Sequence, residues 1–194
     1  MEKSLLAALA AMLLGFFSVF PGKPPETANG TCRCLAVGMD LFVNEADTAP
    51  CSANNAEIMA ALFAAYLPEG TRINRSVNGP GSAEELEERI LEVFAGAREG
   101  DTSVLYLSTH GITWEEPDGS SAAAVILSDG EREEMLEAVR LREMLDRVPG
   151  RKVLILDCCH AGAVLQAFHG AEYCVIAGCG PEEDCYFMAA GGWL

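Results

Sequence analysis

Two side chains that can take part in nucleophilic catalysis each follow a short apolar run. His110 comes soon after Val-Leu-Tyr-Leu at residues 104–107, and Cys159 comes soon after Val-Leu-Ile-Leu at residues 153–156. A cysteine is a nucleophile only as its thiolate, and a neighbouring imidazole supplies both the base and the positive charge that maintain it. Because apolar runs of this length predict buried strands, we expect His110 and Cys159 to stand at two strand ends and to work together.

The glycines beside this pair favour acyl-transfer chemistry. Gly111 follows His110 directly, and Gly162 lies just beyond Cys159. Without side chains the backbone stays uncrowded at these points, so the amide N–H groups of Gly111 and Cys159 are candidates for an oxyanion hole. Two other interpretations stand beside this one: His110 as a hydrogen-bonded structural histidine, and Cys158 rather than Cys159 as the nucleophile.

The elements that would position the pair alternate between strand and helix. Helical spacing predicts helices at 54–66 and 140–148, and Ser-Ala-Glu-Glu at 82–85 opens another with a capping-box pattern. A loop is expected around the Pro-Asp-Gly sequence at 117–119. This alternation predicts an α/β three-layer sandwich with a mostly parallel central sheet, which binds ligands beyond the carboxyl ends of its strands. Apolar runs predict the strands at 34–38, 101–109, 122–127, 151–157 and 173–177, and residues 71–77 are a further candidate strand.

Composition indicates a folded single-domain protein and disfavours nucleic-acid binding. Half of the 194 residues are apolar, and 13 basic against 29 acidic side chains give a formal net charge of −16. A negative field of this size repels phosphate backbones, so no nucleic-acid partner is expected. The sequence has neither a Gly-x-Gly-x-x-Gly loop after a strand nor a P-loop, which disfavours a nucleotide site.

The eight cysteines of the chain lack the spacing of a zinc site. Cys32 and Cys34 are separated by one residue, and no Cys-x-x-Cys pair follows, so no metal is expected. Most of the cysteines, Cys174 above all, are interpreted as buried, reduced, small apolar side chains. The acidic segment at 115–118 is interpreted as a solvated loop rather than a calcium site, and the one at 131–137 as wet surface.

The first 31 residues are expected to stand apart from a folded domain at residues 32–194. Residues 4–20 are uncharged and apolar, and Pro-Gly-Lys-Pro-Pro at 21–25 would end a helix there. This pattern favours a signal peptide or membrane anchor followed by a linker, with N-terminal membrane association, over an apolar helix packed on the domain. The expected location is secreted or membrane-anchored, with a cytoplasmic protein as the alternative.

The sequence resembles the caspase-like cysteine peptidases, and the metacaspase branch more closely than the animal caspases. Ser-Thr-His-Gly at 108–111 is similar to the family's His-Gly motif, and Asp-Cys-Cys-His-Ala-Gly at 157–162 is similar to its Asp-Ser-Cys-His-Ser-Gly motif. The first strand, which ends in Gly38, and the helix that carries Met59 are weaker matches. The resemblance rests on two motifs that occur in the family's order, each at a predicted strand end.

By this resemblance Cys159 is the nucleophile and His110 the base of a catalytic dyad, with the amides of Gly111 and Cys159 in the oxyanion hole. Asp157 would line an acidic pocket that selects Arg or Lys before the scissile bond, since a partly desolvated carboxylate pairs strongly with a guanidinium. Many metacaspases have Asn-Asp where this chain has Asn-Asn, so Asn55 stands in the pocket in place of a second carboxylate.

The predicted function is that of a cysteine-type endopeptidase that cleaves polypeptides after Arg or Lys through a thioester on Cys159, without a cofactor. The chain ends soon after the strand predicted at 173–177, so the family's last strand is expected to be missing and the chain to be C-terminally truncated. The alternatives are an inactive pseudo-peptidase that serves as an interaction module, and a cysteine redox or metal-binding protein. No oligomeric state is predicted.

Overall fold

The computed structural model of the 194-residue chain describes residues 30–44, 51–168, 170 and 172–185. Its main sheet has five strands, all parallel, in the order β2-β1-β3-β7-β8. All five coincide with predicted strands, and β7 and β8 match the predicted ranges residue for residue. Their bounds are β1 (Cys32–Gly38), β2 (Arg72–Val77), β3 (Thr102–Ser108), β7 (Arg151–Asp157) and β8 (Tyr173–Ala177).

The central strands are buried on both faces, which explains why their sequences are apolar without alternation. Along β1, Leu35 and Val37 belong to one core cluster, while Cys34 and Ala36 belong to the other. The same alternation divides β3 and β7 between the two clusters. The sheet is therefore the middle layer of three, and both of its faces need helices to cover them.

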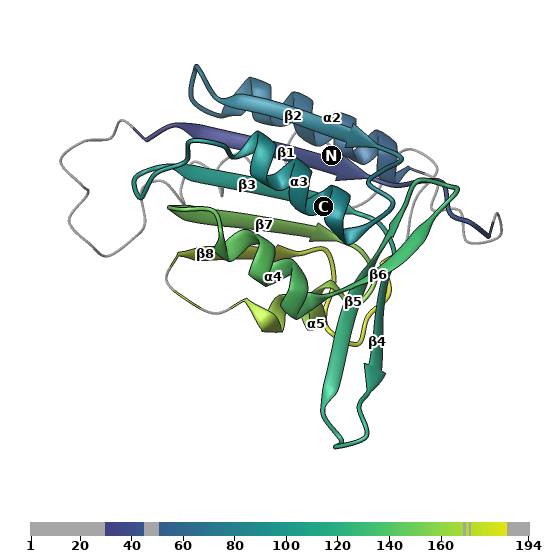
Figure 1. The fold of residues 1–194 in the computed structure, drawn as a ribbon. Coiled ribbons are helices and arrows are strands. Elements are labelled where there is room, and N and C mark those ends of the chain that lie inside the picture. The colour runs from purple at the N-terminus through teal and green to yellow at the C-terminus, as the bar shows by residue number, and fades with distance from the viewer. Residues whose placement is uncertain (1–29, 45–50, 169, 171, 186–194) are drawn as a thin grey trace, which may run out of the picture.

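Helices cover the two faces of the sheet (Figure 1). α2 (Ser52–Tyr66) packs on one face through Met59 and Phe63. This arrangement confirms the predicted three-layer α/β sandwich with a mostly parallel sheet. The other face carries α3 (Ala83–Val93), α4 (Ala138–Asp146), α5 (Ala161–Val164) and the 3-10 turn Leu165–Ala167.

A second, antiparallel sheet projects from the carboxyl end of the main one (Figure 1). Its strands are β4 (Gly111–Glu115), β5 (Ser121–Ser128) and β6 (Glu133–Glu137), in that order. The sequence predicts only β5, and the expected loop is confined to the turn between β4 and β5. The acidic segment at 131–137 is exposed as predicted, except for Leu136. Its last five residues nevertheless form the strand β6. Neither β4 nor β6 has a continuous buried run, so their sequences carry no strong strand pattern.

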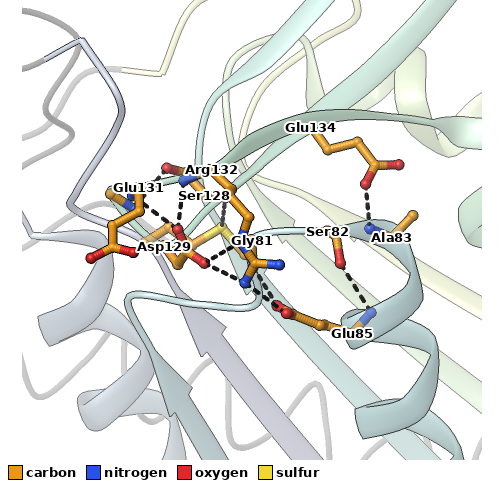
Figure 2. A network of polar contacts seen from close by, with 11 residues as sticks. Gly81, Ser82, Ala83, Glu85, Ser128, Asp129, Glu131, Arg132 and Glu134 are labelled. Carbon is orange, nitrogen blue, oxygen red and sulfur yellow. Dashed lines mark hydrogen bonds and ion pairs between the residues drawn. The ribbon is translucent and has the colours of Figure 1, made fainter.

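Polar contacts fix the turn between β5 and β6 against the start of α3 (Figure 2). Arg132 Nη2 lies 2.7 Å from Glu85 Oε1 and 2.7 Å from Asp129 Oδ2. The Ala83 N–H donates to Glu134 Oε2 at 2.9 Å. Backbone N–H donors, that of Arg132 first, lower the pKa of Asp129 to about 2. The second sheet is thus anchored to a helix of the main core, which orients the residues that β4 and β5 present.

All eight cysteines lie in the described residues, and every one of them is a free thiol. Cys32, Cys34 and Cys158 are buried, as expected of small apolar side chains. The other five are partly exposed, so the prediction that most of the cysteines are buried, Cys174 above all, is wrong. Cys174 lies on β8, which ends the sheet and pairs on one side with β7.

The signal peptide or membrane anchor predicted at residues 1–31 falls on residues that, apart from the last two, lie outside the described part of the chain. Thr31 is described, and its N–H donates to Asp101 Oδ1 at 2.7 Å. Of the helices in the described ranges, none combines the length and apolar character needed to cross a bilayer.

Candidate active site

His110 and Cys159 come from two neighbouring strands of the main sheet. β3 pairs with β7 so that Ser108 is opposite Asp157, and the two candidate residues each stand two positions farther along their segments. The Thr109 N–H donates to the carbonyl oxygen of Asp157 at 3.3 Å, so the segments still run together beyond the ladder. The structure therefore brings both residues to the same edge of the sheet, where parallel strands present their carboxyl ends.

Gly111, the first residue of β4, sets how closely the two segments approach. A Cβ at this position would overlap the carbonyl oxygen of Cys159 and lie 3.0 Å from Cys158 Sγ. Any side chain would push the turn after β7 away from the segment that carries His110. The glycine assigned to an oxyanion hole from the sequence thus has a packing role that the structure makes visible.

The imidazole of His110 packs against an aromatic ring from the segment after β1. The centroid of the Phe42 ring lies 4.5 Å from that of His110, with 52° between the ring planes. Phe42 is buried, and the adjacent Val43 N–H donates to Glu133 Oε2 of β6 at 3.1 Å. The carbonyl oxygen of His110 accepts from the Ile126 N–H of β5 at 2.9 Å. The second sheet therefore supports both the backbone of His110 and the ring that its side chain contacts.

The thiol of Cys159 is partly buried, and its sulfur lies 3.8 Å from the carbonyl oxygen of Cys185. Burial raises the pKa of Cys159; the contact with the Cys185 backbone opposes this shift, and the negative charge of Asp184 adds to it. Cys158 is fully buried, and burial raises its pKa well above the ordinary value. Of the two adjacent thiols, only Cys159 is accessible to an incoming molecule.

The segment after β8 holds the turn that carries Cys159. The backbone of His160 adopts φ 54°, and its N–H donates to the carbonyl oxygen of Glu183 at 2.8 Å. His160 Nε2 lies 3.5 Å from Asp184 Oδ1, and the Gly162 N–H donates to the carbonyl oxygen of Cys179 at 3.1 Å. The side chain of His160 therefore contacts this segment.

Asp157 supplies a buried carboxylate at the end of β7. Its Oδ2 accepts hydrogen bonds from Tyr106 Oη at 2.7 Å, Asn55 Nδ2 at 3.1 Å and Ser108 Oγ at 3.3 Å. Burial raises the pKa of Asp157, and the three donors oppose this shift. Asn55 and Asp157, the two residues expected in a substrate pocket, are thus joined by a direct hydrogen bond.

α2 presents Asn55 here because the helix begins close to the end of β1. A Cβ on Gly38 would overlap the carbonyl oxygen of Ser52, so a side chain there would displace the first turn of the helix. The Ala53 N–H donates to Asp40 Oδ1 at 2.8 Å, which provides one of the helix's first N–H groups with an acceptor. Asn55 lies in the same turn as these residues.

The grouping of an imidazole, a partly exposed thiol and a buried carboxylate suits acyl transfer to cysteine. An imidazole can serve as a base and a thiol as a nucleophile in that chemistry, and a carboxylate can pair with a cationic side chain. Within the described residues, no three His, Cys, Asp or Glu side chains are arranged to hold a metal ion.

Three residues that contact these groups could not be identified from the sequence. Tyr106 occupies an apolar run and has the pattern of a core residue, so only its partner reveals that its hydroxyl matters. Phe42 follows β1 in a segment without periodicity. Cys185 lies beyond the last predicted strand, in no motif. Their contacts are all between residues distant in sequence, and a single sequence holds no signal for these pairings.

Comparison with known proteins connects this fold and site to a family. The family model of the caspase domain matches residues 31–184, which include all the strands and every candidate site residue. The chain therefore belongs to the caspase domain family, in agreement with the resemblance found in its two motifs.

Individual relatives show how far the likeness extends. Metacaspase-3 of Trypanosoma cruzi (strain CL Brener) is 24% identical, over 75% of this chain and 44% of that protein, so the chain spans less than half of this relative's length. The crystal structure of caspase-1 from Spodoptera frugiperda has a TM-score of 0.57 at 13% identity, covering 90% of this chain and 70% of that one. A crystal structure of a protein from Geobacter sulfurreducens has a TM-score of 0.55 at 22% identity, covering 70% and 53%. The two structures share the fold of this chain.

Proposed function

We propose that this chain is a cysteine-type endopeptidase in which Cys159 attacks a peptide carbonyl and His110 acts as the base. The pairing of β3 with β7 carries the proposal, because it brings the segments of both residues to one edge of the sheet. Membership of the caspase domain family and the likeness to metacaspase-3 support the same chemistry. The first step forms a thioester on Cys159 and releases the amine, and water then hydrolyses the thioester.

The resting site keeps the nucleophile protonated, since burial raises the pKa of Cys159. Transfer of its proton to His110 creates a thiolate–imidazolium pair, whose attraction grows when a bound substrate excludes water. The contact with Phe42 limits the positions that the imidazole can take during this transfer. The amide N–H groups of Gly111 and Cys159 are the donors proposed for the oxyanion.

Asp157 is the residue proposed to select Arg or Lys before the scissile bond. Its Oδ2 already accepts three hydrogen bonds, so Oδ1 is the oxygen proposed to receive a guanidinium or ammonium group. Asn55 supports the carboxylate from α2 without adding a second negative charge. The net charge of −16 favours the approach of basic substrates over acidic ones.

An affinity label tests the proposal directly. We expect a thiol-reactive peptide that ends in Arg to modify Cys159, as located by mass spectrometry, and the Cys159→Ala variant to lose turnover of an Arg-ended fluorogenic peptide. Cys174→Ser is the matched control, because this partly exposed cysteine lies on β8, and it should keep both properties. Asp157→Asn should raise the KM for the Arg peptide.

Two results would overturn the proposal. Modification of Cys158 in place of Cys159 would show that the wrong thiol has been assigned. Turnover that does not depend on any cysteine, or no turnover and no selective labelling, would favour the alternative of an interaction module that keeps the caspase fold without its chemistry.

The location of the chain is proposed from residues 4–20 alone, whose uncharged apolar sequence favours membrane targeting and a secreted or membrane-anchored protein. Fractionation of cells that express the full chain, compared with a chain lacking residues 1–29, tests this. Equal amounts of both chains in the soluble cytoplasmic fraction would contradict it.

A further inference from the structure

We infer that Cys179 and Cys185 form a second chemical site in this chain, a dithiol beside Cys159 that low-molecular-weight disulfides oxidise to an intramolecular disulfide. The proposed peptidase reaction uses neither thiol. The dithiol itself is independent of that proposal, whereas its effect on Cys159, described below, rests on it.

The two thiols converge on a single oxygen atom. Cys179 Sγ lies 3.2 Å and Cys185 Sγ lies 3.1 Å from the carbonyl oxygen of Cys158. Two sulfur atoms held this close to one acceptor are near neighbours, and the thiol of Cys179 is among the groups that raise the pKa of Cys185. Both cysteines are partly exposed, so a small oxidant can reach them.

The chain between the two cysteines already turns back on itself. Cys179 Sγ contacts the carbonyl oxygen of Glu183 at 3.1 Å, and the Gly180 N–H donates to Glu183 Oε2 at 2.8 Å. The Glu183 N–H in turn approaches the carbonyl oxygen of Gly180 at 3.4 Å. Because folding has closed this turn, a disulfide between its ends needs little further ordering of the backbone.

Three cysteines on the strands of the main sheet are less well placed for a disulfide. Cys32 and Cys34 lie two residues apart on β1, where an extended strand separates their Cα atoms by about 6.5 Å, near the upper limit for a bridge. Both are also buried, away from a soluble oxidant. Cys174 is partly exposed, but burial is the sole cause of its raised pKa, and no second thiol contributes. Oxidation is therefore expected at Cys179 and Cys185 rather than at these three cysteines.

The reaction is thiol–disulfide exchange in two steps. One protein thiolate attacks the small disulfide, forms a mixed disulfide with one half and releases the other half as a thiol. The second protein thiolate then attacks the sulfur of the first, forms the intramolecular bond and releases the remaining half. Two electrons and two protons pass from the protein dithiol to the small disulfide, which becomes two thiols.

The ends of this segment contact the turn that carries the proposed nucleophile. The carbonyl oxygen of Cys185 lies 3.8 Å from Cys159 Sγ, and the carbonyl oxygen of Cys179 accepts from the Gly162 N–H. A disulfide would hold the segment in this place, and with it the negative charge of Asp184 beside the sulfur. Oxidation should therefore slow the reactions of Cys159, because its thiolate has to form beside the fixed negative charge of Asp184.

Mass spectrometry of the full-length protein tests the dithiol. The reduced chain is treated with oxidised glutathione, quenched with acid, alkylated and digested. We expect the wild type to lose the mass of two hydrogen atoms and to give a peptide pair linked between Cys179 and Cys185. Cys179→Ser and Cys185→Ser should instead stop at a glutathione adduct on the remaining thiol. Cys174→Ser, the matched control, should oxidise as the wild type does.

The Cys159→Ala variant separates this inference from the peptidase proposal, because it should form the same disulfide without any nucleophile at 159. A chain that keeps all eight thiols alkylatable would overturn the inference, as would a disulfide that includes Cys159.

The effect of the disulfide on Cys159 has its own readout, the rate at which iodoacetamide modifies Cys159. We expect this rate to fall several-fold on oxidation of the wild type and to be unaffected by the same treatment in a Cys179→Ser, Cys185→Ser double variant. An unchanged rate in a wild type shown to carry the disulfide would refute this effect.

Discussion

Removing the hydroxyl of Tyr106 tests whether the fold holds Asp157 as an ionised group. Tyr106 is 1% exposed and Asp157 3%, and the hydroxyl donates to Asp157 Oδ2 at 2.7 Å, the shortest of the three contacts on that atom. A hydrogen bond to a charged acceptor contributes about 1.5–3 kcal/mol, against roughly 1 kcal/mol between neutral groups. Tyr106→Phe keeps the ring and its packing, so we expect the free energy of unfolding to fall by about 1.5–3 kcal/mol at neutral pH.

The effect of this substitution should depend on pH in a defined direction. Burial raises the pKa of Asp157, and loss of the Tyr106 donor should raise it further, because that hydrogen bond favours the ionised form. An acid whose pKa is higher in the folded than in the unfolded state favours folding when protonated, and this stability is lost as the pH rises through the folded-state pKa. The difference between wild type and variant should therefore be largest above that pKa and smallest below about pH 4.

Tyr173→Phe is the matched control, because its hydroxyl also donates to an aspartate, Asp146 Oδ1, at 2.6 Å, but in an exposed pair. We expect this control to lose less than about 1 kcal/mol. Thermal and urea unfolding of the three proteins at pH 7 and pH 4 measure the difference, and in a chain of this length the loss from Tyr106→Phe corresponds to about 3–12 °C in Tm. Equal losses from the two variants, or a Tyr106→Phe loss that is the same at both pH values, would refute this account of Asp157.

Three further predictions concern the groups around the proposed dyad. The rate at which iodoacetamide alkylates Cys159 should rise with pH at higher pH values than the rate for a free cysteine, because burial raises the pKa of Cys159. A rise at lower pH values than for free cysteine would contradict the structure. Gly111→Ala should destabilise the fold by about 1–3 kcal/mol and lower kcat, since its Cβ overlaps the carbonyl oxygen of Cys159; wild-type Tm and kcat would show that the segments are not in contact. Phe42→Leu keeps most of the buried volume, so it should lower the free energy of unfolding by less than about 1.5 kcal/mol. It should also lower kcat and alter the pH profile for Arg-peptide cleavage, because His110 loses its ring contact. A profile equal to that of the wild type would remove Phe42 as a positioning residue.

The centre of the main sheet could be predicted because β1, β3 and β7 are largely apolar on both faces. β7 reads Val-Leu-Ile-Leu in its centre, and alternate residues of this run enter the two core clusters, so the sequence pattern and the burial agree. The start of α3 was equally predictable from local chemistry, since Ser82 Oγ accepts from the Glu85 N–H as an N-cap should. The carboxylate of Glu85, however, accepts from the Gly81 N–H in place of the Ser82 N–H of a capping box.

The second sheet could not be predicted because its stability comes from partners far away in sequence. β6 has four exposed residues out of five, and its Glu133 and Glu134 accept hydrogen bonds from Val43 and Ala83. A run of glutamates in a single sequence indicates solvated surface, and that interpretation is correct for its exposure. The backbone pairing with β5 is a tertiary effect that the composition of the segment does not reveal.

Burial is the main cause of the raised pKa at both Asp157 and Cys159. This shared cause links the proposed specificity to the proposed catalysis. Among the described residues, no Lys or Arg side chain is one of the main groups that affect either pKa. A substrate with Arg or Lys before the scissile bond would bring a positive charge into the site, stabilise the carboxylate directly and favour the neighbouring thiolate through the same field. The basic side chain would therefore act as more than a recognition element. On this reasoning the alkylation rate of Cys159 should rise at a lower pH when a small arginine amide is bound than when it is absent. The amide should have no such effect in the Asp157→Asn variant.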